Sequence, residues 1–162
     1  MENNHTKNTF GKKNHLKSRK HTEQLFASGK SFFVHPIKVF WRLPDGGEEL
    51  QKPTANRQDT ITEATDSHGP YSEKVLVGVS ASKRNFKKAT DRNRVKRLLR
   101  EAYRTNQQGL VASANSQSGQ LHVFFIYVDK TLPTFALVEE KMLACLKKLQ
   151  KILGEKRNEK LL

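Results

Sequence analysis

The chain of 162 residues carries 30 lysines and arginines against 16 acidic residues, a formal net charge of +14, and 35% of its residues are hydrophobic. The length and apolar content predict one domain with a modest core, and the charge indicates a polyanionic partner, foremost a nucleic acid. A single cysteine excludes an internal disulfide and a cysteine-rich zinc site, and no apolar run approaches the roughly 20 residues that a membrane-spanning helix needs.

The N-terminal residues are basic and polar. Residues 1–9 are predicted to form a disordered tail, and the segment lacks the apolar core of a signal peptide, so we expect a cytoplasmic protein. The first helix is predicted within residues 16–29, LKSRKHTEQLFASG, with Gly29 just beyond its last turn.

The next segment, SFFVHPIKVFWRL at residues 31–43, has the period-two pattern of a strand. One face carries Ile37, Val39, Trp41 and Leu43, and the other carries Lys38, Phe40 and Arg42. Pro36 is expected to divide the segment into two short strands or to mark a bulge.

Residues 44–73 hold seven acidic residues against two basic ones, three of the five prolines, and almost no periodic apolar pattern. This composition predicts a long polar insertion rather than a core element. A loop of this length is either mobile or functional, and we favour a flexible acidic insertion.

Two further strands and a closing helix are predicted. KVLVGVSASK at residues 74–83 is the third strand region, and LHVFFIYV at residues 121–128 is an apolar run of the kind that is covered on both faces. The last helix is expected to start at a Thr134 N-cap and to end at Gly154, leaving residues 154–162 as a tail. Its buried stripe is predicted to comprise Phe135, Val138, Met142, Cys145, Leu146, Leu149 and Ile152. We therefore expect the thiol of Cys145 to be buried rather than reactive.

The most charged segment is KRNFKKATDRNRVKRLLREAYR at residues 83–104, with ten basic and two acidic residues. A helix is predicted from a Thr90 N-cap, with Asp91 in its first turn. Its buried face would hold Val95, Leu98, Leu99, Ala102 and Tyr103. The opposite face would hold Asn93, Lys96, Arg97, Arg100 and Arg104, flanked by Arg92 and Arg94.

Two interpretations of this charged face compete. A solvated face with salt bridges needs acids one turn away, and in this helix Glu101 alone stands there, next to Arg97 or Arg104. The uncompensated charge favours a nucleic-acid surface. Folded RNA fits better than duplex DNA, because the chain shows no helix-turn-helix, zinc or zipper motif.

Lys38, Phe40 and Arg42 combine phosphate attraction with a stacking ring, which is typical of single-strand binding. Ordinary core packing is the alternative for Phe40, and also for Phe26. The six histidines match no zinc spacing, so no protein metal site is expected. No candidate nucleophile has a base nearby and the acidic residues are scattered, so we expect no protein catalytic residues.

The string VGVSASKRNFKKATDRNRVKRLLREAYR at residues 77–104 resembles the signature of the bacterial ribonuclease P protein component. NHLKSRKHTEQLFASGKSF at residues 14–32 resembles the opening helix and turn of the same family. With the last strand and helix, the resemblance covers about residues 10–43 and 74–153, and it places the domain at residues 10–153.

The resemblance implies an α/β fold, a two-layer α+β sandwich in the order α-β-β-β-α-β-α. It would be similar to domain 2 of ribosomal protein S5, with a left-handed β-α-β crossover in place of the usual right-handed one. The family assists a catalytic RNA that removes the 5′ leader of precursor tRNA, so it implies endoribonuclease function as the protein subunit of an RNA-catalysed holoenzyme. Mg²⁺ would be bound mainly by the RNA subunit, with one protein per RNA and no membrane partner.

The resemblance also assigns residues. Arg92, Asn93, Arg94, Lys96, Arg97 and Arg100 would bind the RNA subunit. Phe26, Phe40 and Lys83 would line the leader cleft, together with Lys38 and Arg42 from the strand pattern. The chain departs from the family at Thr22, where an aromatic is common, in a longer crossover segment containing Phe86, and in the acidic insertion. The alternative function is a structural or general RNA-binding protein, such as a ribosome component or RNA chaperone.

Overall fold

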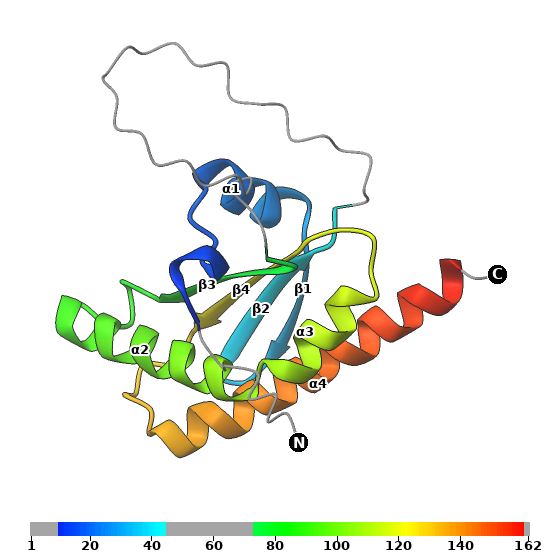
Figure 1. The fold of residues 1–162 in the computed structure, drawn as a ribbon. Coiled ribbons are helices and arrows are strands. Elements are labelled where there is room, and N and C mark those ends of the chain that lie inside the picture. Colours follow the sequence, from blue (N-terminus) through cyan, green and yellow to red (C-terminus); the bar gives the residue numbers. More distant parts are fainter. Residues whose placement is uncertain (1–9, 45–72, 161–162) are drawn as a thin grey trace, which may run out of the picture.

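The computed structural model describes residues 10–44 and 73–160. Its elements are η1 (Lys12–Asn14), α1 (Arg19–Ser28), β1 (Lys30–Val34), β2 (Ile37–Arg42), β3 (Val75–Ala81), α2 (Ala89–Asn106), α3 (Gln108–Asn115), β4 (Leu121–Tyr127) and α4 (Phe135–Lys160). This is the predicted mixed α/β order with two additions, the short 3-10 helix η1 and the helix α3 that follows α2 (Figure 1). The expectations for residues 1–9 and 45–72 lie outside the described residues.

The four strands form one sheet in the order β1-β2-β4-β3. β1 and β2 make an antiparallel hairpin around Pro36, which confirms that this proline separates two strands. β2 pairs antiparallel with β4, and β4 pairs parallel with β3. Parallel neighbours need a long crossover, and here the chain passes through α2 and α3 between the two strands (Figure 1).

The alternation along β2 separates two faces of the sheet, as the sequence predicts. Ile37, Val39 and Trp41 are buried on the face that α2 and α4 cover, here called the core face. Lys38, Phe40 and Arg42 lie on the opposite face, here called the α1 face, because α1 packs there (Figure 1). The strand pattern therefore assigns each β2 side chain to one of two surfaces.

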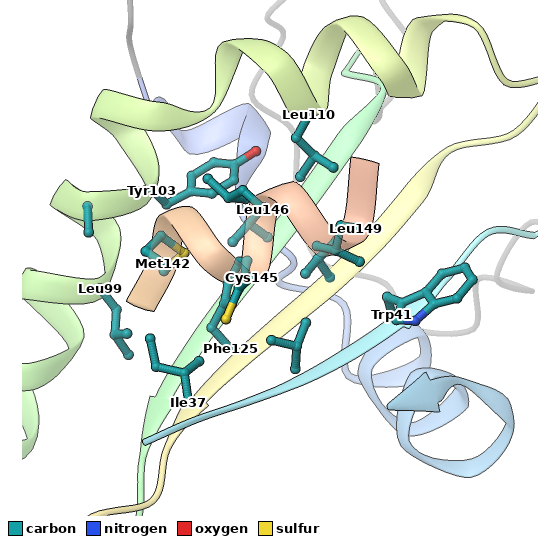
Figure 2. Packing of buried hydrophobic residues seen from close by; sticks show 14 of the residues in the cluster. Ile37, Trp41, Leu99, Tyr103, Leu110, Phe125, Met142, Cys145, Leu146 and Leu149 are labelled. Atoms are coloured by element: carbon teal, nitrogen blue, oxygen red, sulfur yellow. The ribbon is translucent and has the colours of Figure 1, made fainter. Parts of the chain in front are cut away.

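The main core lies between the core face and the helices. Tyr103 and Leu99 of α2, Leu110 of α3 and Phe125 of β4 meet residues of α4 there (Figure 2). Cys145 is part of this core, and burial raises the pKa of its thiol to about 12, so the prediction of a buried cysteine is confirmed. The predicted buried face of α2 is confirmed as well, with Leu98 at its half-buried margin.

Helix α4 differs from its prediction at its end. Thr134 caps the helix as expected, since its Oγ1 accepts a hydrogen bond from the Leu137 N–H at 3.4 Å. The end at Gly154 is wrong, because the helix continues to Lys160. Glycine costs a helix about 1 kcal/mol, and the added turn brings the Lys156 ammonium 5.0 Å from the centroid of the Trp41 ring.

The buried stripe of α4 also needs two corrections. Phe135 is the first residue of α4 and remains 37% exposed at that end of the helix. Leu153 is fully buried, whereas Ile152 is half-buried at the margin of the core. The other five predicted positions are buried.

Helix α2 begins at Ala89, two residues before the start predicted from a Thr90 N-cap. Lys88 is the N-cap residue and makes no side-chain capping bond, so Thr90 lies inside the first turn. The backbone N–H of Arg92 donates to the Lys88 carbonyl at 3.3 Å, which closes that turn. Asp91 stands in the first turn as predicted, where a carboxylate favours the helix dipole.

Pro44 and Glu73, the two described residues that flank the acidic insertion, both adjoin the start of β4. A side-chain carbon at Gly119 would stand 2.1 Å from the Pro44 carbonyl oxygen, so the two backbones touch. The Gln120 amide donates to the Glu73 carbonyl oxygen at 2.6 Å. The insertion therefore leaves and re-enters the domain at neighbouring points.

Candidate nucleic-acid interface

The first candidate surface is the exposed side of α2, here called the basic ridge and defined by the predicted residues Arg92, Asn93, Arg94, Lys96, Arg97 and Arg100. Asn93, Arg94 and Arg97 are exposed, whereas Lys96 and Arg100 are half-buried. The ridge exists because Val95, Leu99 and Tyr103 anchor the other side of the helix in the core. The structure thus brings the predicted side chains together on one helix.

Arg92 has a structural role that the sequence did not reveal. Its Nη1 donates to the carbonyl oxygens of Phe86 at 2.8 Å and Lys87 at 2.7 Å. These bonds hold the turn that leads into α2, and Phe86 itself is buried 5.9 Å from the Tyr127 ring centroid. Arg92 therefore positions the start of the ridge and offers fewer free donors than its neighbours.

The ion pair that the structure records on α2 joins Glu101 and Arg104, just beyond the C-terminal end of the ridge. Glu101 accepts two hydrogen bonds from Arg104, at 3.0 Å and 2.6 Å, and these bonds lower the pKa of the Glu101 carboxyl. Among the described residues, no acidic side chain forms an ion pair with Arg94 or Arg97. The charge that could attract phosphates is thus concentrated on the first three turns of α2.

The second candidate surface lies on the α1 face and centres on three rings, here called the aromatic cluster: Phe26, Phe40 and Phe124. The Phe26 centroid lies 4.9 Å from that of Phe40 and 5.2 Å from that of Phe124, both in edge-on geometry. Phe26 is 42% exposed, while Phe40 and Phe124 are half-buried against the small apolar cluster of Leu16, Leu25 and Leu76. The rings therefore combine a packed base with an exposed edge.

Gly78 makes room for this cluster. It pairs with Phe124 across β3 and β4, and a side-chain carbon at residue 78 would stand 2.4 Å from two ring atoms of Phe124. Real carbon contacts of this kind are essentially never so short, so any larger residue would displace the ring. The glycine of the VGVSAS segment thus fixes where the Phe124 ring lies.

The predicted cations border the aromatic cluster at different points. The Lys38 ammonium lies 4.9 Å from the Phe40 ring centroid, within cation–π range. Arg42 stands at the other end of β2, where its Nη1 donates to Gln24 of α1 at 3.4 Å. Lys83 is exposed in the turn after β3, at the end of the sheet where Lys38 lies, and no ring contact joins it to the cluster among the described residues.

Two histidines lie under α1 beside Arg42. The rings of His21 on α1 and His122 on β4 have centroids 5.1 Å apart. Burial, with the nearby charges of His21 and Arg42, lowers the pKa of His122 to about 4, and His21 is shifted in the same direction by burial, Lys20 and Arg42. His122 is therefore neutral near pH 7, and its Nε2 lies 3.0 Å from the Gln120 Oε1.

Sequence reasoning missed two residues of the α1 face. The apolar run at residues 121–128 predicts a strand covered on both faces, but the alternation of β4 places Phe124 on the side of His122 rather than of Phe125. The face of Phe33 follows only from its pairing with Lys38 across the hairpin, which the sequence does not show. The period-two pattern of the strand is a signal that could have revealed Phe124, whereas the face of Phe33 depends on the register of the hairpin.

The described residues bring together no group of three or more His, Cys, Asp or Glu side chains that could hold a metal ion. Residues 10–44 and 73–160 also contain no helix that is long and apolar enough to cross a bilayer.

A family model described as Ribonuclease P matches residues 10–150, which include both surfaces. The chain belongs to the ribonuclease P protein family. A curated relative from Porphyromonas gingivalis, named Ribonuclease P protein component, is 32% identical over 83% of this chain and 82% of its own length. A second relative of that name, from Chlorobium phaeobacteroides, is 30% identical over 83% of this chain and 84% of its own length.

Solved ribonuclease P proteins share the fold. The protein from Thermotoga maritima superposes with a TM-score of 0.53 and 22% identity, covering 83% of this chain and 96% of that one. The protein from Staphylococcus aureus gives a TM-score of 0.53 and 15% identity, covering 86% of this chain and 97% of that one. Membership of the ribonuclease P protein family implies a tRNA-processing ribonucleoprotein with an RNA partner.

Proposed function

We propose that this protein is the subunit through which a ribonuclease P RNA gains affinity for precursor tRNA. The basic ridge binds the RNA subunit, and the α1 face binds the single-stranded 5′ leader. One observation supports the assignment of two ligands to two surfaces: the basic ridge and the α1 face differ in chemistry and lie on opposite sides of one sheet (Figure 1).

The composition of the basic ridge supports its role. Arg94 and Arg97 have extended, delocalised cations that suit paired hydrogen bonds to phosphate oxygens. Their exposure without an acidic partner among the described residues leaves them available for a polyanion. Asn93 adds an amide that can both donate and accept.

The composition of the α1 face supports a different ligand. An exposed edge at Phe26 and a cation above the Phe40 ring fit a strand whose unpaired bases stack and whose phosphates contact Lys38. Duplex RNA hides its base faces, so this surface favours an unpaired leader over the paired body of tRNA. The missing aromatic at Thr22 leaves Phe26 and Phe40 as the main platforms, with Phe124 behind them.

The protein's own residues contribute binding and orientation rather than bond cleavage. We propose that Mg²⁺ is held mainly by the RNA subunit, since the described residues offer no group of carboxylates for it. When bound there, the ion would activate water for attack on the phosphodiester. The protein would neutralise phosphates and fix the leader, in one copy per RNA and in the cytoplasm.

Reconstitution with a cognate RNA subunit tests this proposal. The protein is expected to raise the affinity of the RNA for precursor tRNA and to leave its affinity for mature tRNA nearly unchanged. The protein alone should cleave neither substrate, with or without Mg²⁺. An equal gain for both tRNAs would favour a general RNA-binding protein, and specific 5′ cleavage by RNA-free protein would contradict the proposal.

A further inference from the structure

Phe33 on β1 is an exposed ring beside the proposed leader surface. It is 52% exposed, the largest fraction among the exposed large hydrophobic residues that the structure describes. The hairpin register pairs it with Lys38, so it shares the α1 face with Phe40. Its neighbours Phe32 and Val34 point the other way and pack against the core.

The fold does not need this ring for packing. Among the described residues, Phe33 belongs to neither apolar cluster, and its one ring contact is with His35, at 5.8 Å between centroids and an interplanar angle of 85°. An exposed aromatic on a sheet edge is an aggregation hazard unless a ligand uses it. The position of Phe33 is therefore better explained by binding than by stability.

Lys38 links Phe33 to the aromatic cluster. It lies directly across from Phe33 in the hairpin, and its ammonium is 4.9 Å from the Phe40 ring centroid. Phe33 and Phe40 are diagonal neighbours across two antiparallel strands, a separation of roughly 7–8 Å that long side chains can bridge. Two rings on one face, with a cation that pairs with one and contacts the other, would suit stacked bases and a phosphate.

The charge around Phe33 favours an anionic strand. Residues 30–44 contain Lys30, Lys38 and Arg42 and no acidic residue. A carboxylate, that of Asp129, interacts electrostatically with His35, the residue whose ring contacts Phe33. This carboxylate accepts hydrogen bonds from the Lys130 N–H at 2.6 Å and from the Thr131 hydroxyl at 3.1 Å. Lys30, Lys38 and Arg42 therefore give this segment a net positive charge.

We propose that Phe33 is a further base-stacking position, which extends the single-stranded leader track from Phe40 past Lys38 onto the β1–β2 hairpin. The ligand is an unpaired nucleotide of the leader, farther from the aromatic cluster than the one at Phe40. This inference rests on the proposed function and adds an end point to the leader path.

The test measures the affinity of the reconstituted holoenzyme for precursor tRNAs whose leaders lengthen one nucleotide at a time. The unsubstituted protein should gain affinity with each nucleotide until the leader reaches Phe33. Phe33→Ala should lose the last gain, about fivefold or more, and reach its plateau at a shorter leader. Phe33→Trp keeps a stacking ring and should retain the full profile.

Two further variants separate the possible failures. Leu143→Ala removes an exposed apolar side chain from α4 and should change nothing. If Phe40→Leu shortens the profile but Phe33→Ala does not, the Phe33 position is wrong and the leader surface stands. If neither changes the profile, the proposed leader surface fails as well. Equal loss by Phe33→Ala at every length, mature tRNA included, would also overturn the inference.

Discussion

At the scale of single residues, the Phe124 ring occupies space that any side chain at Gly78 would fill. Gly78→Ala should therefore displace the ring and destabilise the domain by about 1–3 kcal/mol, the usual cost of overpacking. In a Phe124→Ala background the clash is gone, so the same substitution should cost much less. Urea unfolding of the four proteins measures this coupling, and equal costs in both backgrounds would contradict the role assigned to Gly78.

The pH dependence of stability follows from another buried residue of the α1 face, His122. Its pKa is lowered from an ordinary 6.5 to about 4, so between these values the unfolded chain binds a proton that the folded chain does not. The contribution of His122 to the free energy of unfolding is complete above pH 6.5. It is lost as the pH falls toward 4, and the loss is at most about 3 kcal/mol.

The measurement is the free energy of unfolding from pH 7 to 4.5, for the unsubstituted protein and for His122→Gln. The variant should show a weaker loss toward acid, although His21, whose pKa is lowered in the same direction, keeps part of it. Parallel curves for the two proteins would show that His122 is not responsible.

At the scale of elements, the acidic insertion is attached at two neighbouring points. β2 and β3 flank β4, and strands pack about 4.8 Å apart, so a linker has to span roughly 10 Å between them. Deleting residues 46–70 with a short Gly-Ser closure should therefore leave the fold and precursor processing within about tenfold of the unaltered protein. Circular dichroism checks the fold, and a greater loss of processing in a folded deletion would assign the insertion a function.

How far the sequence predicted each element depends on whether its pattern was local. The period of β2 and the apolar stripe of α2 gave the correct faces, because one buried side suffices to orient a strand or helix. The ends of helices were harder to predict. Gly154 predicts the wrong end for α4, because the last turns of this helix contact Trp41 through Lys156, a residue far from Trp41 in the chain. Phe33 likewise depended on the register of a hairpin.

At the scale of the whole molecule, the net charge of +14 predicts an assembly that depends on salt. Each phosphate contact releases condensed counterions, so log affinity for the RNA subunit should fall linearly with log salt. Replacing Arg94 and Arg97 by alanine should reduce that slope by about 1.4–1.8. Lys151→Ala with Arg157→Ala removes the same charge from exposed sites on α4 and should leave the slope nearly unchanged. Equal changes for both pairs would show that net charge acts without a specific ridge.

The central claim is that one small domain presents two separate RNA surfaces. Its most direct test measures, for each variant, the affinity for the RNA subunit and the precursor-to-mature tRNA preference of the saturated complex. Arg94→Ala with Arg97→Ala should weaken assembly and keep the preference. Phe40→Ala should keep assembly and lower the preference, by about 1–3 kcal/mol for one lost stack.

Phe40 is half-buried, so Phe40→Leu accompanies it as a variant that keeps apolar packing, and thermal melts check that both fold. The account predicts that each variant changes one of the two quantities and not the other. If the arginine and Phe40 variants instead lose RNA-subunit binding equally, and neither changes the precursor-to-mature preference, the assignment of two surfaces is contradicted.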